Sequence, residues 1–173
     1  MSRVRRLAPI ISQRGDHTCW YACAEMIVSY YQIQHQGETH SYWPGHDTLG
    51  QYSIGQPRMS RRRGVPNQTL MLTGHNVAAF ARRYTLRVIR GGRPSERQLA
   101  RYLLSNGPLW YGGAVRGYRG VHGTNHVVVI VGLWDGQIEV NDPDPPGRRI
   151  WMDFNVFFRS LAWIEGIPLI AAA

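Results

Sequence analysis

Residues 126–142 have the sequence HVVVIVGLWDGQIEVND, which predicts an antiparallel β-hairpin. The run from Val127 to Val131 is apolar and β-branched throughout, as expected for a buried strand. Asp135-Gly136 is a strong two-residue turn signal, and the residues after it supply the returning strand. Such a hairpin places the start of its first strand beside the end of its second. We therefore expect Asp142 to lie close to His126.

Around this hairpin the sequence predicts helices first and strands second. We expect helices at 18–31, 75–83 and 95–106, strands at 85–89, 108–115 and 148–152, and a short helix at 153–159. Ser95 and Gln98 have the spacing of a capping box, and Gly107 has the place of a C-terminal glycine. Residues 34–68 are polar and predict loops. This order indicates an α+β fold in a single domain, 1–173.

The composition fits one globular domain. The chain has 173 residues, of which 43% are hydrophobic and 18% charged, so it can bury a core and is not a disordered chain. No apolar run reaches the roughly 18 residues of a membrane span. The basic residues near the N-terminus are not followed by a signal-peptide core, because Gln13, Arg14 and Asp16 interrupt it. We expect no classical signal peptide.

All 20 Lys and Arg residues are arginine, which favours anionic partners, and the net charge is +9. The densest run, Arg61 to Arg63, has no neighbouring aromatic residues and is typical of a solvated loop, so we do not expect a nucleic-acid partner. The two cysteines, Cys19 and Cys23, are four residues apart in one predicted helix and cannot form a disulfide framework. A reducing compartment fits them best.

Cys19 is a candidate nucleophile. It lies in the first turn of the predicted helix, where the positive end of the macrodipole favours a thiolate, although buried cysteine is also a common core residue. A thiol nucleophile needs a base, and that base needs an orienting group. Of the seven histidines, His126 alone begins an apolar strand, and Asp142 follows it by sixteen residues. Gln13, six residues before Cys19, can add a side-chain amide to the oxyanion site.

These residues carry a family resemblance. Gln13-x5-Cys19-Trp20, followed by a helix ending in Tyr30-Tyr31, resembles the first half of the active site of papain-like cysteine peptidases. Asn125 to Gly132, followed by Val140 to Pro143, resembles the second half. The chain is most similar to the compact bacterial branch, which includes bacteriocin-leader-processing peptidases and effector proteases of plant-pathogenic bacteria.

The resemblance implies a papain-like fold, in which the nucleophile helix packs on a C-terminal antiparallel sheet. It implies catalysis by Cys19, His126 and Asp142 through an acyl-thioenzyme, with Gln13 in the oxyanion hole and no cofactor or metal. We expect the substrate to be a protein or peptide. Its contacts are expected at Trp20, Thr124 and Asn125.

Several alternatives stay open at this point. Papain itself orients its histidine with an asparagine, so Asn141 competes with Asp142. The same thiol chemistry serves amidases, deamidases and transglutaminases, and a silent basic binding module would keep the fold without turnover. His35, His40, His46 and Asp47 could hold a metal, but their Gly/Pro-rich surroundings favour a loop whose Tyr42 and Trp43 line a substrate groove.

The nucleophile motif Thr18-Cys19-Trp20 is closer to the effector type than to the Asp-Cys-Gly of many leader-processing enzymes. The resemblance therefore implies a bacterial toxin or translocated effector as the biological role. Such a protein would be made in the bacterial cytoplasm and exported to act in a target cell. A cognate inhibitor or immunity protein would be its partner.

Overall fold

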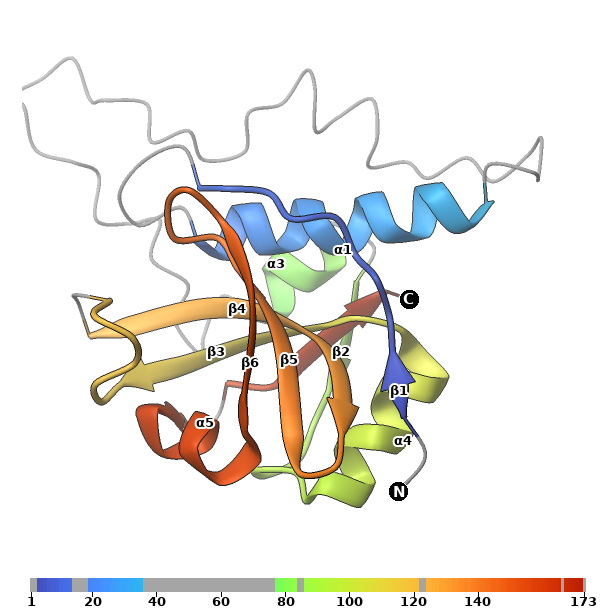
Figure 1. Ribbon diagram of the computed structural model, residues 1–173. Coiled ribbons are helices and arrows are strands. Elements are labelled where there is room, and N and C mark those ends of the chain that lie inside the picture. Colours follow the sequence, from blue (N-terminus) through green and yellow to red (C-terminus); the bar gives the residue numbers. More distant parts are fainter. Residues whose placement is uncertain are drawn as a thin grey trace, which may run out of the picture.

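The computed structural model describes residues 3–13, 19–35, 77–83, 86–121, 124–165 and 167–172. Its elements run in the order β1 (Val4–Arg5), α1 (Cys19–His35), α3 (Val77–Arg83), β2 (Leu86–Ile89), α4 (Glu96–Asn106), β3 (Leu109–Val115), β4 (Asn125–Trp134), β5 (Gln137–Asp142), β6 (Arg148–Asp153), α5 (Phe154–Ser160), β7 (Leu161–Trp163) and β8 (Leu169–Ala172). The fold is α+β, as the sequence predicts, with helices packed on an antiparallel sheet (Figure 1).

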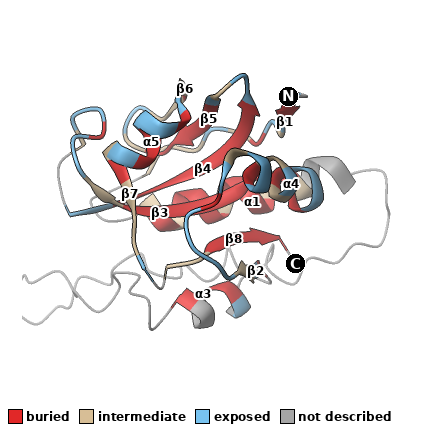
Figure 2. Ribbon diagram, turned by 90° about the horizontal axis from the view of Figure 1, so that it is seen from below, coloured by how far each residue is buried: buried red, intermediate tan, exposed pale blue. Residues whose placement is uncertain are grey.

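The sheet has the strand order β2-β8-β3-β4-β5-β6, and every pairing in it is antiparallel. β1 pairs with β4 beyond the end of β3, and β7 pairs with the other end of β3. β4 is buried along most of its length (Figure 2), and its buried residues alternate between two hydrophobic clusters on the two faces of the sheet. Val127, Val129 and Val131 pack with residues of α1 and α3. Val128 and Ile130 pack with residues of α4 and α5.

The local signals in the second half of the chain are confirmed. Ser95 and Gln98 form the capping box, with Ser95 N donating to Gln98 Oε1 at 2.9 Å. Gly107 ends α4 at φ 67°, and its N–H donates to the Leu103 carbonyl. Asp153 caps α5 by accepting from the backbone N–H of Val156 at 2.9 Å.

The sequence analysis missed three strands. β1, β7 and β8 are two, three and four residues long, too short for an alternating pattern to stand out. β8 nevertheless lies inside the sheet, between β2 and β3. Helix α1 also continues to His35, four residues beyond the predicted end at Tyr31. The predictions for Thr18 and for residues 36–68, including Arg61 to Arg63, lie outside the described residues.

Candidate active site

His126 and Asp142 form a buried pair at one end of the β4–β5 hairpin. His126 is the second residue of β4, and Asp142 is the last residue of β5. The His126 Nε2 atom lies 2.8 Å from Asp142 Oδ1, and the two side chains are 5% and 0% exposed. The hairpin therefore brings together the two residues that were expected to meet.

A one-residue bulge decides which face of β5 meets His126. Near the turn the ladder pairs Gly132 with Glu139, but after the irregularity it pairs Ile130 with Val140 and Val129 with Asn141. The extra residue on β4 is Val131. Without it, Asn141 would lie opposite Ile130 and share the face of His126, because side chains alternate along a strand. The bulge exchanges the two faces and gives that place to Asp142.

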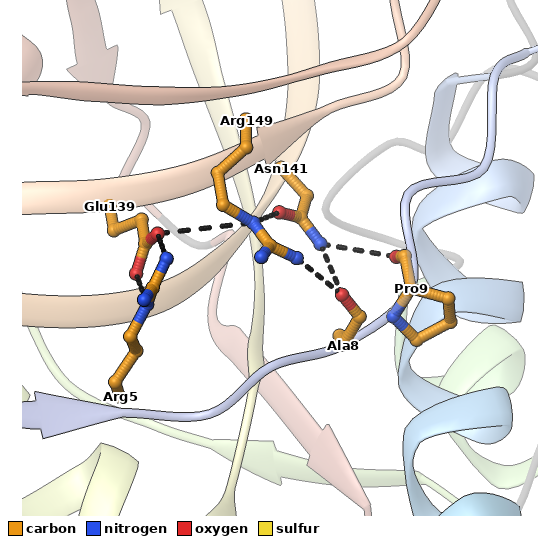
Figure 3. A network of polar contacts seen from close by, with 6 residues as sticks. All are labelled: Arg5, Ala8, Pro9, Glu139, Asn141 and Arg149. Atoms are coloured by element: carbon orange, nitrogen blue, oxygen red, sulfur yellow. Dashed lines mark hydrogen bonds and ion pairs between the residues drawn. The ribbon is translucent and has the colours of Figure 1, made fainter.

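Asn141 accordingly points away from His126. Its Nδ2 donates to the carbonyls of Ala8 and Pro9 at 3.0 and 3.1 Å, and its Oδ1 accepts from Arg149 Nε at 2.9 Å (Figure 3). All of these partners lie on the N-terminal segment or on β6. Asn141 is thus fully engaged with groups other than the imidazole.

Cys19 lies near the imidazole, at the start of α1. It is the first residue of α1 and is partly exposed, and its thiol is near enough to His126 to raise the pKa of the imidazole. Because Nε2 of His126 is taken by Asp142, Nδ1 is the ring nitrogen left for the thiol. Cys23, one turn along α1, is completely buried and bonds the Val127 carbonyl through Sγ at 3.4 Å. Burial raises the pKa of the Cys23 thiol well above its ordinary value, so Cys23 stays protonated.

The electrostatics favour a charged imidazole at neutral pH. Burial of His126 works against the cation, but the hydrogen bond to Asp142 and the neighbouring Cys19 outweigh burial and raise the pKa of His126 to about 9. A group with a raised pKa keeps its proton until the pH passes that value. His126 is therefore imidazolium from neutral pH up to about pH 9.

Gln13 lies beside the end of β5. Its backbone N–H donates to the Pro143 carbonyl at 2.8 Å, directly after Asp142 in the chain. Its Oε1 atom is buried and has no hydrogen-bond partner among the described residues. The side-chain amide is thus held in the same part of the molecule as the His126–Asp142 pair.

The expected substrate contacts differ in their surroundings. Thr124 and Asn125 are exposed at the start of β4, next to His126. Trp20 is only 7% exposed and packs edge-on against Tyr21 and Phe80, while its carbonyl accepts from Trp110 Nε1. Packing explains the place of Trp20, and substrate contact by all three residues stays a prediction.

Tyr118 is a residue of the site that the sequence analysis missed. It is fully buried in the turn between β3 and β4, and its ring centroid lies 5.8 Å from that of His126. Burial and then the neighbouring Asp142 carboxylate raise the pKa of the Tyr118 phenol. The hydroxyl reaches toward this carboxylate, although neither Tyr118 Oη nor Asp142 Oδ2 has a hydrogen bond of ordinary geometry within the described segments. Only the flanking Gly117 and Gly120 mark a turn there, and no motif could have pointed to the contact.

The described part of the chain contains no cluster of three or more His, Cys, Asp or Glu side chains suited to a metal ion. The histidines and the aspartate weighed for such a site lie outside it, apart from His35, whose backbone alone is described. Within the same ranges, no helix has the length and apolarity of a membrane span.

Comparisons with known proteins identify the family and the fold of the chain. The family model described as papain-like cysteine protease AvrRpt2 matches residues 6–162. The crystal structure of a double glycine motif protease from an AMS/PCAT transporter, in complex with the leader peptide, has the same fold with a TM-score of 0.53. The two chains are 18% identical, and the match covers 99% of this chain and 94% of the other. No curated protein matches this chain.

Proposed function

Since the chain belongs to the family of the papain-like cysteine protease AvrRpt2 and is a papain-like cysteine peptidase, we propose that it hydrolyses peptide bonds in a protein substrate through a Cys19–His126–Asp142 triad. One observation carries the assignment. The buried His126 imidazole bonds the Asp142 carboxylate through Nε2, and the Cys19 thiol is near enough to raise the pKa of the same imidazole. A nucleophile, a proton carrier and an orienting group in this order are what acyl transfer requires.

The reaction begins with attack of the Cys19 thiolate on the carbonyl carbon of the scissile bond. A C–S bond forms, and the carbonyl oxygen becomes an oxyanion. The backbone N–H of Cys19 and the side-chain amide of Gln13 donate to this oxyanion. His126, charged because its pKa is about 9, gives its proton to the leaving amine as the C–N bond breaks.

The remaining thioester is then hydrolysed. Neutral His126 takes a proton from a water molecule, whose oxygen attacks the thioester carbonyl. The C–S bond breaks, the carboxylic acid product leaves and loses its proton to solvent, and the thiolate–imidazolium pair is restored. Asp142 keeps the imidazole aligned through both steps and stabilises its charged form.

A peptide probe with an epoxide group tests this assignment. The full chain is treated with less than one equivalent of probe near neutral pH, and the modified peptide is identified by mass spectrometry. We expect rapid modification of Cys19 and none of Cys23, whose thiol is buried and whose pKa is raised. The matched control is Cys23→Ala, which should label at the wild-type rate. Equal labelling of Cys23 in the folded protein would contradict the assignment.

Substrate cleavage is tested separately. The wild-type chain and Cys19→Ala are incubated with a cell extract, and the new N-termini are mapped by mass spectrometry. We expect new N-termini only with the wild-type chain. Ammonia release without new N-termini would favour a deamidase, and joined peptides would favour a transglutaminase.

We propose in addition that the peptidase acts as a bacterial toxin or effector, made in the bacterial cytoplasm and exported to a target cell. The resemblance to effector proteases and the net charge of +9 support this proposal. A protein that is toxic to its producer would need a cognate inhibitor or immunity protein there. Expression inside a target cell should slow growth with the wild-type chain and not with Cys19→Ala; equal growth would refute the toxin role.

A further inference from the structure

The N-terminal segment that ends at Gln13 is fastened to β5 and β6 by polar contacts. Arg5 donates to the buried Glu139 carboxylate through Nε and Nη2, at 2.7 and 2.6 Å. Further along, Arg149 Nη2 donates to the Ala8 carbonyl at 2.7 Å. Figure 3 shows that these contacts and those of Asn141 form one continuous network between the segment and the sheet.

Asn141 lies at the centre of this network. It is 0% exposed, and its amide group bridges the carbonyls of Ala8 and Pro9 on one side and the Arg149 guanidinium on the other. A buried amide with three partners is costly to disturb, because truncation leaves the partners unsatisfied. Asn141 therefore fixes the position of the N-terminal segment relative to the end of β5.

The contacts between the segment and the sheet continue as far as Gln13. Ser12 and Gln13 both bond the Pro143 carbonyl, the backbone N–H of Gln13 at 2.8 Å. Gly147 lies against Ile10 and Ser12 so closely that a Cβ atom there would come within 3.3 Å of both. From residue 8 to residue 13, the segment thus follows the surface made by residues 141–147.

Asn141 and Asp142 are consecutive residues, so their side chains lie on opposite faces of β5. Asp142 holds His126 on one face of β5, and Asn141 holds the segment of Gln13 on the other. We propose that Asn141, together with Arg149, is a positioning residue for the oxyanion donor Gln13. This inference rests on the proposed function. The end of β5 then aligns both the base and the oxyanion hole of one active site.

A double-mutant cycle tests the inference. kcat and KM are measured for the full-length wild type, Asn141→Ala, Gln13→Ala and the double variant, with a peptide substrate identified from the mapped cleavage sites. We expect Asn141→Ala to lower kcat by about tenfold or more, but by less than the ~10²- to 10³-fold of a lost oxyanion donor, with little change in KM. In the Gln13→Ala background, Asn141→Ala should cost less than about twofold, because the donor that it positions is already gone.

Arg149→Ala is the second variant, for the case that Asn141→Ala does not fold. Arg149 is partly exposed, holds the same Ala8 carbonyl and should show the same non-additivity with Gln13→Ala. Asn106→Ala is the matched control, since Asn106 is a buried asparagine whose side-chain amide donates to the Tyr102 carbonyl within α4, away from the N-terminal segment. It should leave kcat unchanged.

The outcomes separate the inference from the proposed function. Equal loss from Asn141→Ala or Arg149→Ala in the wild-type and Gln13→Ala backgrounds overturns the inference alone. A Gln13→Ala variant as active as the wild type removes the oxyanion role, and the inference falls with it. An inactive wild type overturns the proposed function itself.

Discussion

The two halves of the proposed catalytic centre are held together in different ways. His126 and Asp142 lie on adjacent strands of one hairpin, sixteen residues apart, and the β-ladder between them sets their geometry. The segment carrying Gln13 is held beside them by contacts between residues 130 to 141 positions apart in the sequence. Loss of one contact should therefore affect the two halves differently. Substitutions in the hairpin should alter the pH dependence of the rate, whereas substitutions along the N-terminal segment should alter kcat alone.

The largest expected effects come from the two groups that handle the reacting atoms. Cys19→Ala removes the sulfur that forms the thioester, and His126→Ala removes the proton carrier. Each should lower kcat/KM by about 10⁴-fold or more, and the double variant should be little worse than either. Steady-state kinetics with the same peptide measures this, with circular dichroism as the check on folding. A substantial residual rate in Cys19→Ala would mean that another nucleophile acts.

Gln13→Ala should have the next largest effect. It should reduce kcat by about 10²- to 10³-fold while KM and the pH optimum stay near the wild-type values, because the amide bonds the oxyanion and not the bound substrate. Single-turnover kinetics at several pH values checks both statements. A loss as complete as that of Cys19→Ala would indicate a different role for Gln13.

Much of the hairpin could be predicted from the sequence, because its turn residues and apolar run are local signals. The bulge at Val131 could not. A regular hairpin with the turn at Asp135-Gly136 would turn Asn141 toward His126, so the prediction of Asp142 depended on spacing and on the resemblance. The extra residue occurs where β1 pairs with β4, and Arg6 N donates to the Val131 carbonyl. The bulge is thus stabilised by a segment about 125 residues away, which no local pattern encodes.

The fastening of the N-terminal segment was unpredictable for a similar reason. Arg5, Glu139 and Arg149 are ordinary charged residues in the sequence, and only the fold brings them together. Tyr118 belongs to the same class, since its role depends on the packing of its turn over His126. Motifs identify the residues that react, whereas the residues that align them depend on the tertiary fold.

Asp142→Ala should change the pH dependence of the rate. The imidazolium of His126 depends on Asp142, so its pKa should fall from about 9 to near or below its ordinary value of 6.5. The alkaline limb of the pH–rate profile should move down with it, and the rate at neutral pH should fall by more than tenfold. Asn141→Ala, on the other face, should lower kcat and leave this limb in place. A shift in the Asn141 variant and none in Asp142→Ala would falsify the assignment of Asp142.

The smallest expected effect is that of Tyr118→Phe, which keeps the ring against His126 and removes only the hydroxyl beside Asp142. A carboxylate without this polar hydroxyl beside it is less stabilised and is therefore a stronger acceptor for His126. The pKa of His126 should therefore rise above about 9, and the alkaline limb should move up, opposite in sign to Asp142→Ala. The less acidic imidazolium is a poorer proton donor to the leaving amine, so kcat should fall by roughly two- to fivefold.

Tyr111→Phe is the matched control for this last variant. Tyr111 is equally buried, but its hydroxyl donates to the Leu161 carbonyl at 2.7 Å, and its ring packs against Phe157, Phe158 and Trp163. Its loss should lower the free energy of unfolding by about 1 kcal/mol and leave the pH–rate profile unchanged. If Tyr118→Phe behaves in the same way, the hydroxyl contributes to stability alone. Each of the two variants removes one buried hydroxyl and keeps its ring. If the alkaline limb of the pH–rate profile moves up only in Tyr118→Phe, the hydroxyl of Tyr118 therefore acts on the His126–Asp142 pair.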